Sequence, residues 1–175
     1  MGKSALLSHV ENLLIGEEQA RKGITMFLDY LERYSETRLG ITPFIVRGES
    51  QEVIVGATGE ATSCTDILGT IRENAAYVGA GYPYSCLDVA TSLARRGCAL
   101  IMAVEGVQGE KLCDEQGDMD IQTAGFAIIE EGRLSGYLDE DETMGVLMVT
   151  ENLRAAELDL EGRGVKLTVM LTGCK

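Results

Sequence analysis

The spacing of apolar residues predicts a strand and then a helix at the start of the chain. Val10–Ile15 ends in three consecutive apolar side chains, a run typical of a strand covered on both faces. Glu17–Tyr34 carries apolar residues at helical spacing, and glutamates occupy its first turn, where the helix dipole favours negative charge. We therefore expect one continuous helix over this second range.

A second strand is predicted over Thr37–Arg47. Pro43 lies inside this range and has no N–H to donate to a sheet. The strand is therefore expected at the edge of a sheet or with a bulge. Its apolar positions are Leu39, Ile41, Phe44, Ile45 and Val46.

Two serine-led motifs predict helix starts in the middle of the chain. Ser63–Asp66 and Ser85–Asp88 each place a serine three residues before an aspartate, which resembles a capping box. The second helix should stop at Gly97. The segment Val78–Tyr84, with two glycines and a proline, is predicted to be a turn, and Ala99–Val104 a buried strand.

The last third of the chain is predicted to contain two hairpins separated by a helix. Ala124–Ile129 and Arg133–Leu138 flank a turn that contains a glycine. Asp139–Glu142 should cap the helix. Leu158–Leu171 predicts the second hairpin, in which apolar and polar residues alternate so that one face is buried.

Together these elements predict an α+β fold, in which a mixed β-sheet packs with helices. The length of 175 residues suits one ordinary domain or two small ones. The division expected in the second case is residues 1–98 and 99–175. The acidic segment Gly109–Asp120 is predicted to be an exposed loop or linker.

Charge and hydropathy restrict the function classes. The net charge of −13 argues against nucleic-acid binding and against direct adhesion to anionic lipid, because both need a basic face. No apolar run reaches the roughly 18 residues of a membrane-spanning helix. No signal-peptide pattern follows Met1, so the chain as given is expected to be soluble.

Side chains able to react are few. His9 is the only histidine, so a histidine-based catalytic dyad would have to use it, and we expect it to face solvent or cap a helix instead. A His-rich metal site is excluded, because it needs more than one histidine. The cysteines are odd in number and never at Cys-x-x-Cys spacing, so we interpret them as buried free thiols. They are Cys64, Cys86, Cys98, Cys113 and Cys174.

Glycine and carboxylate motifs favour structural roles. Gly106–Lys111 lacks the spacing of a phosphate-binding loop, and Gly79–Gly81 precedes a proline instead of a helix, so both are predicted to be turns. Glu17–Glu18, Glu130–Glu131 and Asp139–Glu142 suit helix starts or turns. Catalysis by two carboxylates across a cleft stays open as an alternative. No catalytic, cofactor-binding or metal-binding residue is predicted.

Several stretches of the chain resemble the Ger(x)C family, the C subunits of spore germinant receptors. Leu13–Ile24 is similar to the family strand and helix of the type hLKVIVIGEELAREGL. Leu28–Arg33 and Thr37–Gly48 follow the course of the next family motif. Thr123–Leu138 resembles the family hairpin, and Glu142–Gly145 matches the Glu-Thr-x-Gly that comes after it.

These stretches occur in the family's order and span about Leu6 to Val149. Arg133 stands where the family hairpin has lysine, and Ile128 or Ile129 where it has phenylalanine. Gly56–Val104 agrees only in its helix pattern. Family members begin with a signal peptide and lipobox and end in a further large domain, so we expect this chain to be an internal piece.

The resemblance implies a non-catalytic lipoprotein subunit without a cofactor. It would be lipid-anchored at the outer face of the spore inner membrane and would assemble with membrane-embedded receptor subunits. Candidate contacts are the Thr37–Arg47 strand and the Tyr82–Tyr84 turn, although ordinary packing also explains both. The alternative is a small-molecule module that binds the germinant in an apolar pocket.

Overall fold

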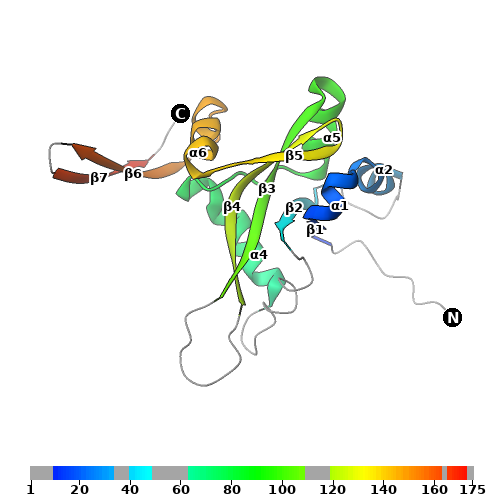
Figure 1. Cartoon of the computed structure of the whole chain (residues 1–175), viewed down its shortest axis with the longest axis horizontal. Helices are drawn as coiled ribbons and strands as arrows, with labels where there is room; N and C mark the ends of the chain where they lie inside the picture. Colours follow the sequence, from blue (N-terminus) through cyan, green and yellow to red (C-terminus); the bar gives the residue numbers. More distant parts are fainter. Residues whose placement is uncertain (1–9, 34–39, 49–62, 109–118, 163–164, 173–175) are drawn as a thin grey trace, which may run out of the picture.

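In the part of the chain that the structure describes, a five-stranded mixed sheet forms the centre of the molecule (Figure 1). The structure is a computed structural model that describes residues 10–33, 40–48, 63–108, 119–162 and 165–172. The strands of the sheet, in spatial order, are β1 (Asn12–Gly16), β2 (Thr42–Arg47), β3 (Cys98–Gln108), β4 (Met119–Glu130) and β5 (Arg133–Leu138). β1, β2 and β3 pair in parallel, and β3, β4 and β5 pair antiparallel.

Helices cover both faces of this sheet. Ile45 and Ile101 point to a core shared with α1, α2 and α5, whereas Phe44 and Met102 point to a core shared with α4 and α6. This alternation follows from the two-residue period of a strand. The predicted α+β class, a mixed sheet packed with helices, is confirmed. The helices are α1 (Glu17–Lys22), α2 (Thr25–Arg33), α4 (Cys64–Val78), α5 (Cys86–Arg96) and α6 (Glu140–Val149).

The single helix predicted over Glu17–Tyr34 is wrong, because the chain breaks between α1 and α2. Gly23 has a φ of 139°, outside the helical region. The N–H of Ile24 donates to the carbonyl oxygen of Gly132 at 2.8 Å, and Ile24 is fully buried. In a continuous helix this N–H would donate to a carbonyl oxygen of the helix itself. Here it donates to the β4–β5 turn instead.

β2 lies inside the sheet, so the prediction of an edge or bulged strand over Thr37–Arg47 is wrong for its described residues, 40–47. The N–H of Thr42 donates to the carbonyl oxygen of Glu11, beside β1, at 2.9 Å. Successive strand residues direct their backbone groups to opposite sides. The backbone nitrogen of Pro43 therefore faces β3. Because the pairing of β2 with β3 begins only at Phe44, the missing N–H of Pro43 costs the sheet no hydrogen bond.

The predicted helix caps are confirmed. Ser63 and Ser85 each accept a hydrogen bond from the N–H of the aspartate three residues later, and each aspartate accepts one in return. Asp139 forms the same capping box at the start of α6. Gly97 ends α5 in the left-handed conformation, with a φ of 72°. Local signals therefore set where these helices begin and end.

β4 changes course at Gly125, which has a φ of 72°. The N–H of the next residue, Phe126, donates to Oγ1 of the fully buried Thr143 on α6 at 3.2 Å. A side chain at position 125 would meet the carbonyl oxygen of Leu138 and the Thr143 hydroxyl. Only glycine fits here, and its absence of a side chain lets α6 dock against the sheet.

A two-stranded hairpin, β6 (Ala155–Gly162) and β7 (Val165–Thr172), follows α6 and projects from the body of the molecule (Figure 1). The predicted second hairpin is thereby confirmed. Its predicted buried face is only partly covered, because Val169 and Leu171 are half-buried, while Met170 is exposed.

The five-stranded sheet contains strands from both sides of the division at residues 98 and 99, since β2 pairs with β3. The division into two subdomains stays a prediction. Among the described helices, none combines the length and the apolar character that crossing a membrane requires.

Candidate functional site

The two contact segments expected from the sequence pack inside the described structure. Thr42–Val46 of β2 is buried throughout, so this strand offers no free edge. Tyr82 and Tyr84 are half-buried, with ring centroids 5.0 Å apart. The Tyr84 ring lies 6.1 Å from that of Phe126, and its hydroxyl accepts a hydrogen bond from Asn152 Nδ2 at 3.1 Å. Packing within the fold therefore accounts for the apolar and aromatic residues of both segments.

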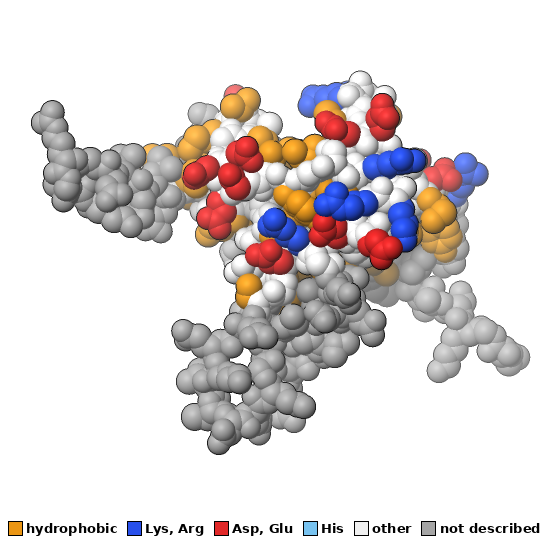
Figure 2. Space-filling view, in the orientation of Figure 1, with side chains coloured by type: hydrophobic (Ala, Val, Ile, Leu, Met, Phe, Trp, Pro, Cys, Tyr) orange, Lys and Arg blue, Asp and Glu red, His pale blue; other side chains and the backbone are white. Residues whose placement is uncertain are grey.

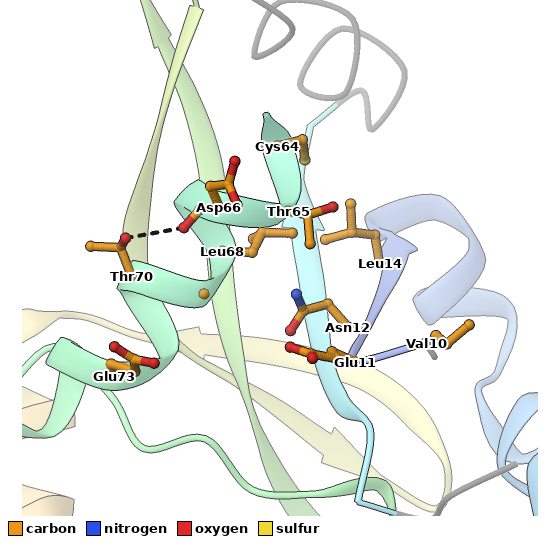
Figure 3. Close-up of a pocket in the computed structure, with 11 residues that line it drawn as sticks. Val10, Glu11, Asn12, Leu14, Cys64, Thr65, Asp66, Leu68, Thr70 and Glu73 are labelled. Atoms are coloured by element: carbon orange, nitrogen blue, oxygen red, sulfur yellow. Dashed lines mark hydrogen bonds between the residues drawn. The ribbon is translucent and has the colours of Figure 1, made fainter. Parts of the chain in front are cut away.

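A cavity of about 740 Å³ lies between β1 and α4 (Figure 3). Val10, Glu11, Asn12 and Leu14 line it from the β1 side, and residues 64–73 of α4 supply the rest of the lining. Its volume is in the range of small-ligand sites, roughly 300–1,000 Å³. The cavity combines apolar walls with a few polar groups.

Asn12 contributes a buried amide to this cavity. Figure 3 shows the amide pointing from β1 toward α4. Both Nδ2 and Oδ1 are buried, and neither has a hydrogen-bond partner among the described residues. A buried donor or acceptor without a partner costs about 1–3 kcal/mol. A bound group that paired with this amide would remove that cost.

Carboxylates dominate the charges around the cavity. The Glu11 carboxylate pairs with Arg72 Nη2 at 3.2 Å, which links the start of β1 to α4. The Asp66 carboxylate belongs to the α4 capping box, and Glu73 is exposed at the rim. The described lining residues include no basic side chain. The cavity therefore favours a neutral or cationic ligand over an anion.

Two of the described thiols are shielded from solvent. Burial raises the pKa of the Cys64 thiol, beside the cavity, and raises that of Cys86 to about 11. Such thiols stay protonated at neutral pH and are weak nucleophiles. The prediction of buried thiols is confirmed for Cys86, holds in part for the half-buried Cys64 and is wrong for the exposed Cys98. The other two cysteines lie outside the described residues.

A second polar cluster lies where the parallel strands end. The Glu17 carboxylate at the start of α1 accepts from Arg21 Nη2 at 2.7 Å and from the N–H of Gly48 at 3.1 Å. The Arg21 hydrogen bond, followed by that of Gly48, holds the pKa of Glu17 below its ordinary value. Because Gly48 follows β2, this carboxylate ties α1 to the end of that strand.

Tyr137 of β5 lies beside the same cluster. The Arg47 guanidinium carbon is 4.9 Å from its ring centroid. The buried Tyr137 hydroxyl makes no hydrogen bond of standard geometry with the described residues, although the Glu17 carboxylate is near enough to act on its pKa. Burial, together with the Glu17 charge, raises the pKa of Tyr137 to about 12. The hydroxyl is therefore neutral at physiological pH and cannot serve as a base.

The paired acidic residues occupy the turns and helix starts that the sequence predicts. Glu130–Glu131 lies at the exposed β4–β5 turn, and Asp139–Glu142 starts α6. Within the described ranges, no three potential metal ligands of the His, Cys, Asp or Glu type come together. His9 lies outside those ranges. These positions give the carboxylates structural roles, and the lack of catalysis stays an expectation.

Exposed apolar side chains lie at the C-terminal ends of α4 and α6. Val149 is 86% exposed and Val78 is 61% exposed. The segment that follows α6 is linked to the last turn of α4, since the N–H of Arg154 donates to the carbonyl oxygen of Ala76 at 2.9 Å. Figure 2 shows hydrophobic side chains interspersed with acidic ones over α6. We call Tyr77, Val78, Met148 and Val149 the α4–α6 surface.

Neither Asn12 nor the α4–α6 surface was among the predicted contacts. The sequence did contain a signal for Asn12. Its amide stands next to an apolar run that is expected to be covered on both faces, and a buried amide needs a hydrogen-bond partner. For Val78 and Val149 there was no such signal. Val78 was expected in the turn after the helix, whereas α4 extends to it, and Val149 ends α6; only the tertiary arrangement shows that both are exposed.

Comparisons with known proteins agree with the fold and the motifs. The family model described as spore germination protein N-terminal domain matches residues 1–105. The crystal structure of the GerBC protein is similar, with a TM-score of 0.65 and 20% sequence identity over 94% of this chain and 44% of GerBC. The chain thus spans less than half the length of GerBC. No curated protein sequence matches.

The family match covers more than half of the chain and includes the Leu13–Gly48 stretches that resemble the Ger(x)C family. The likeness to GerBC shows that the same fold continues beyond the matched residues. The chain therefore belongs to the family defined by the spore germination protein N-terminal domain, which confirms the resemblance to the C subunits of germinant receptors.

Proposed function

We propose that this chain is part of a non-catalytic germinant-receptor subunit that acts by binding other receptor subunits. In the full-length protein, a lipid anchor holds it at the outer face of the spore inner membrane, beside the membrane-embedded subunits. The net charge of −13 is consistent with tethering by an anchor, because an acidic surface is not attracted to anionic lipid.

The α4–α6 surface carries this proposal. Its most exposed side chain, Val149, is 86% accessible, and clusters of exposed apolar residues mark interaction sites. Glu151 is exposed two residues after Val149, and the Arg154 guanidinium carbon lies 5.8 Å from the Tyr77 ring centroid, so charged residues flank the apolar side chains. An apolar centre with a polar rim is the usual anatomy of a protein–protein interface.

Site-specific photo-crosslinking tests the proposal. A photoreactive amino acid at position 149 is expected to crosslink the chain to a membrane-embedded receptor subunit. The same group at position 26, where Met26 is 68% exposed on α2 at the other end of the molecule, is the control and should not crosslink (Figure 1). Equal crosslinking from both positions, or none from position 149, would count against the α4–α6 surface.

A second candidate function is direct germinant binding, and a cavity of about 780 Å³ beside α5 favours it. Tyr84, Leu87 and Leu100 give this cavity apolar walls, and Asp88 and Arg96 give it two opposite charges. Calorimetry with amino acids and sugars tests this function. Heat that disappears in an Arg96→Ala variant would support it, and the absence of heat with any of these compounds would remove it.

A further inference from the structure

The outer side of β1 has no partner strand among the described residues. The hydrogen bond from Thr42 N–H to the Glu11 carbonyl oxygen fixes which backbone groups face β2. Because alternate residues face opposite sides, Asn12 and Leu14 direct their N–H and C=O groups outward. An unpaired edge of this kind is a template for another extended chain.

The same two residues also line the cavity between β1 and α4. Asn12 and Leu14 direct their side chains to the α4 side, where Leu14 packs in the same apolar cluster as Leu68 and all three line the cavity. A strand added to β1 would place every second side chain next to theirs, on the face covered by α4. The edge and the cavity therefore form one groove, with backbone hydrogen bonds along β1 and a pocket for a side chain beside it.

The chemistry of this groove selects a basic side chain. The Asn12 amide offers an acceptor and a donor that have no partners among the described residues. Glu73 and Asp66 add negative charge, Glu11 is paired with Arg72, and the described lining contains no basic residue. A lysine or arginine side chain could donate to Asn12 Oδ1 near these carboxylates, while Nδ2 could donate to a carbonyl of the added strand.

We propose that the groove between β1 and α4 binds an extended segment of a partner polypeptide, added to β1 as an edge strand with a basic side chain beside Asn12. This site uses the first turns of α4, whereas the α4–α6 surface uses its last turn. The proposal is therefore independent of the contact proposed at the α4–α6 surface, and either can fail without the other.

Selection from a displayed library of random peptides, with the whole chain as target, tests the groove. Lysine- or arginine-containing peptides are expected to be enriched and to slow hydrogen exchange at the outward N–H groups of Asn12 and Leu14. Asn12→Leu should weaken their binding at least about tenfold, since one charge-assisted and one neutral hydrogen bond are lost. It should not lower the unfolding midpoint, because the amide has no described partner to lose.

Charge provides a matched pair of variants. Glu73→Lys at the rim should weaken the selected peptides, whereas Glu32→Lys, on an exposed position of α2, should leave their affinity unchanged. The proposal is overturned if no peptide is enriched, if exchange slows elsewhere, or if Asn12→Leu binds equally well or unfolds more easily. Protection of β1 by self-association, or by a free small molecule in place of a peptide, would also overturn it.

Discussion

At the scale of single residues, the motifs that carry the family resemblance have physical roles inside the fold. Gly125 and Thr143 meet where β4 changes course, and Glu17 and Gly48 meet where α1 joins β2. Each contact joins segments that are far apart in the sequence. The motifs could be recognised from the sequence. The residue that each motif residue contacts could not be predicted, because no pattern of neighbouring residues indicates a contact between distant segments.

Gly125→Ala is expected to lower the free energy of unfolding by roughly 3 kcal/mol, from backbone strain at positive φ plus the steric clash. Chemical denaturation measures this loss. Gly136→Ala in β5 is the matched control, because a Cβ there would meet nothing within 4 Å. It should change stability by about 0.5 kcal/mol or less. Similar effects of both substitutions would contradict the role given to Gly125.

Tyr137→Phe should keep or raise the free energy of unfolding, by up to about 1 kcal/mol, because it removes a buried hydroxyl without a described partner. Tyr84→Phe should instead cost about 1 kcal/mol, since the Tyr84 hydroxyl accepts a hydrogen bond from Asn152. Thermal unfolding of the two variants compares them directly. Greater destabilisation by Tyr137→Phe would show that its hydroxyl has a partner after all.

At the scale of helices and strands, the sequence predicted those features that depend only on neighbouring residues. The capping boxes at Ser63 and Ser85 and the stop at Gly97 were predicted and observed, because each depends on residues within one helix turn. The break at Gly23 was not predicted, since it depends on a hydrogen bond from Ile24 to the β4–β5 turn. The interior place of β2 was also missed, because Pro43 lies before pairing with β3 begins.

Docking of α1 onto β2 is expected to depend on pH through Glu17. Its pKa in the folded chain is below the ordinary 4.5, so its stabilisation is present above that pH and is lost as pH falls through the folded pKa. Glu17→Gln should cost roughly 1 kcal/mol at neutral pH. The difference from the unsubstituted chain should shrink as the pH falls below 4.5.

The matched control for this prediction is Glu18→Gln. Glu18 pairs only with Lys22 in the described structure and is exposed, so its substitution should shift the denaturation midpoint less than Glu17→Gln. Denaturation curves at several pH values from neutral to acidic give both quantities. A Glu17→Gln deficit that stays constant with pH would mean that the carboxylate charge does not hold α1 in place.

At the scale of the whole molecule, a mixed sheet with helices on both faces leaves two distinct surfaces near opposite ends of α4. One is the groove beside β1, and the other is the α4–α6 surface, from which the β6–β7 hairpin continues (Figure 1). The class of the fold was predictable from the order of strands and helices. The surfaces were not, because each is assembled from segments that only tertiary packing brings together.

The central proposal is that this chain acts by binding other receptor subunits through its surface. Its most direct test is the dissociation constant between the chain and the membrane-embedded subunits in detergent. The double substitution Val78→Asp and Val149→Asp should weaken binding at least about tenfold, whereas Met26→Asp should not change it. Equal affinities for all three chains, or no binding by the unsubstituted chain, would contradict the claim.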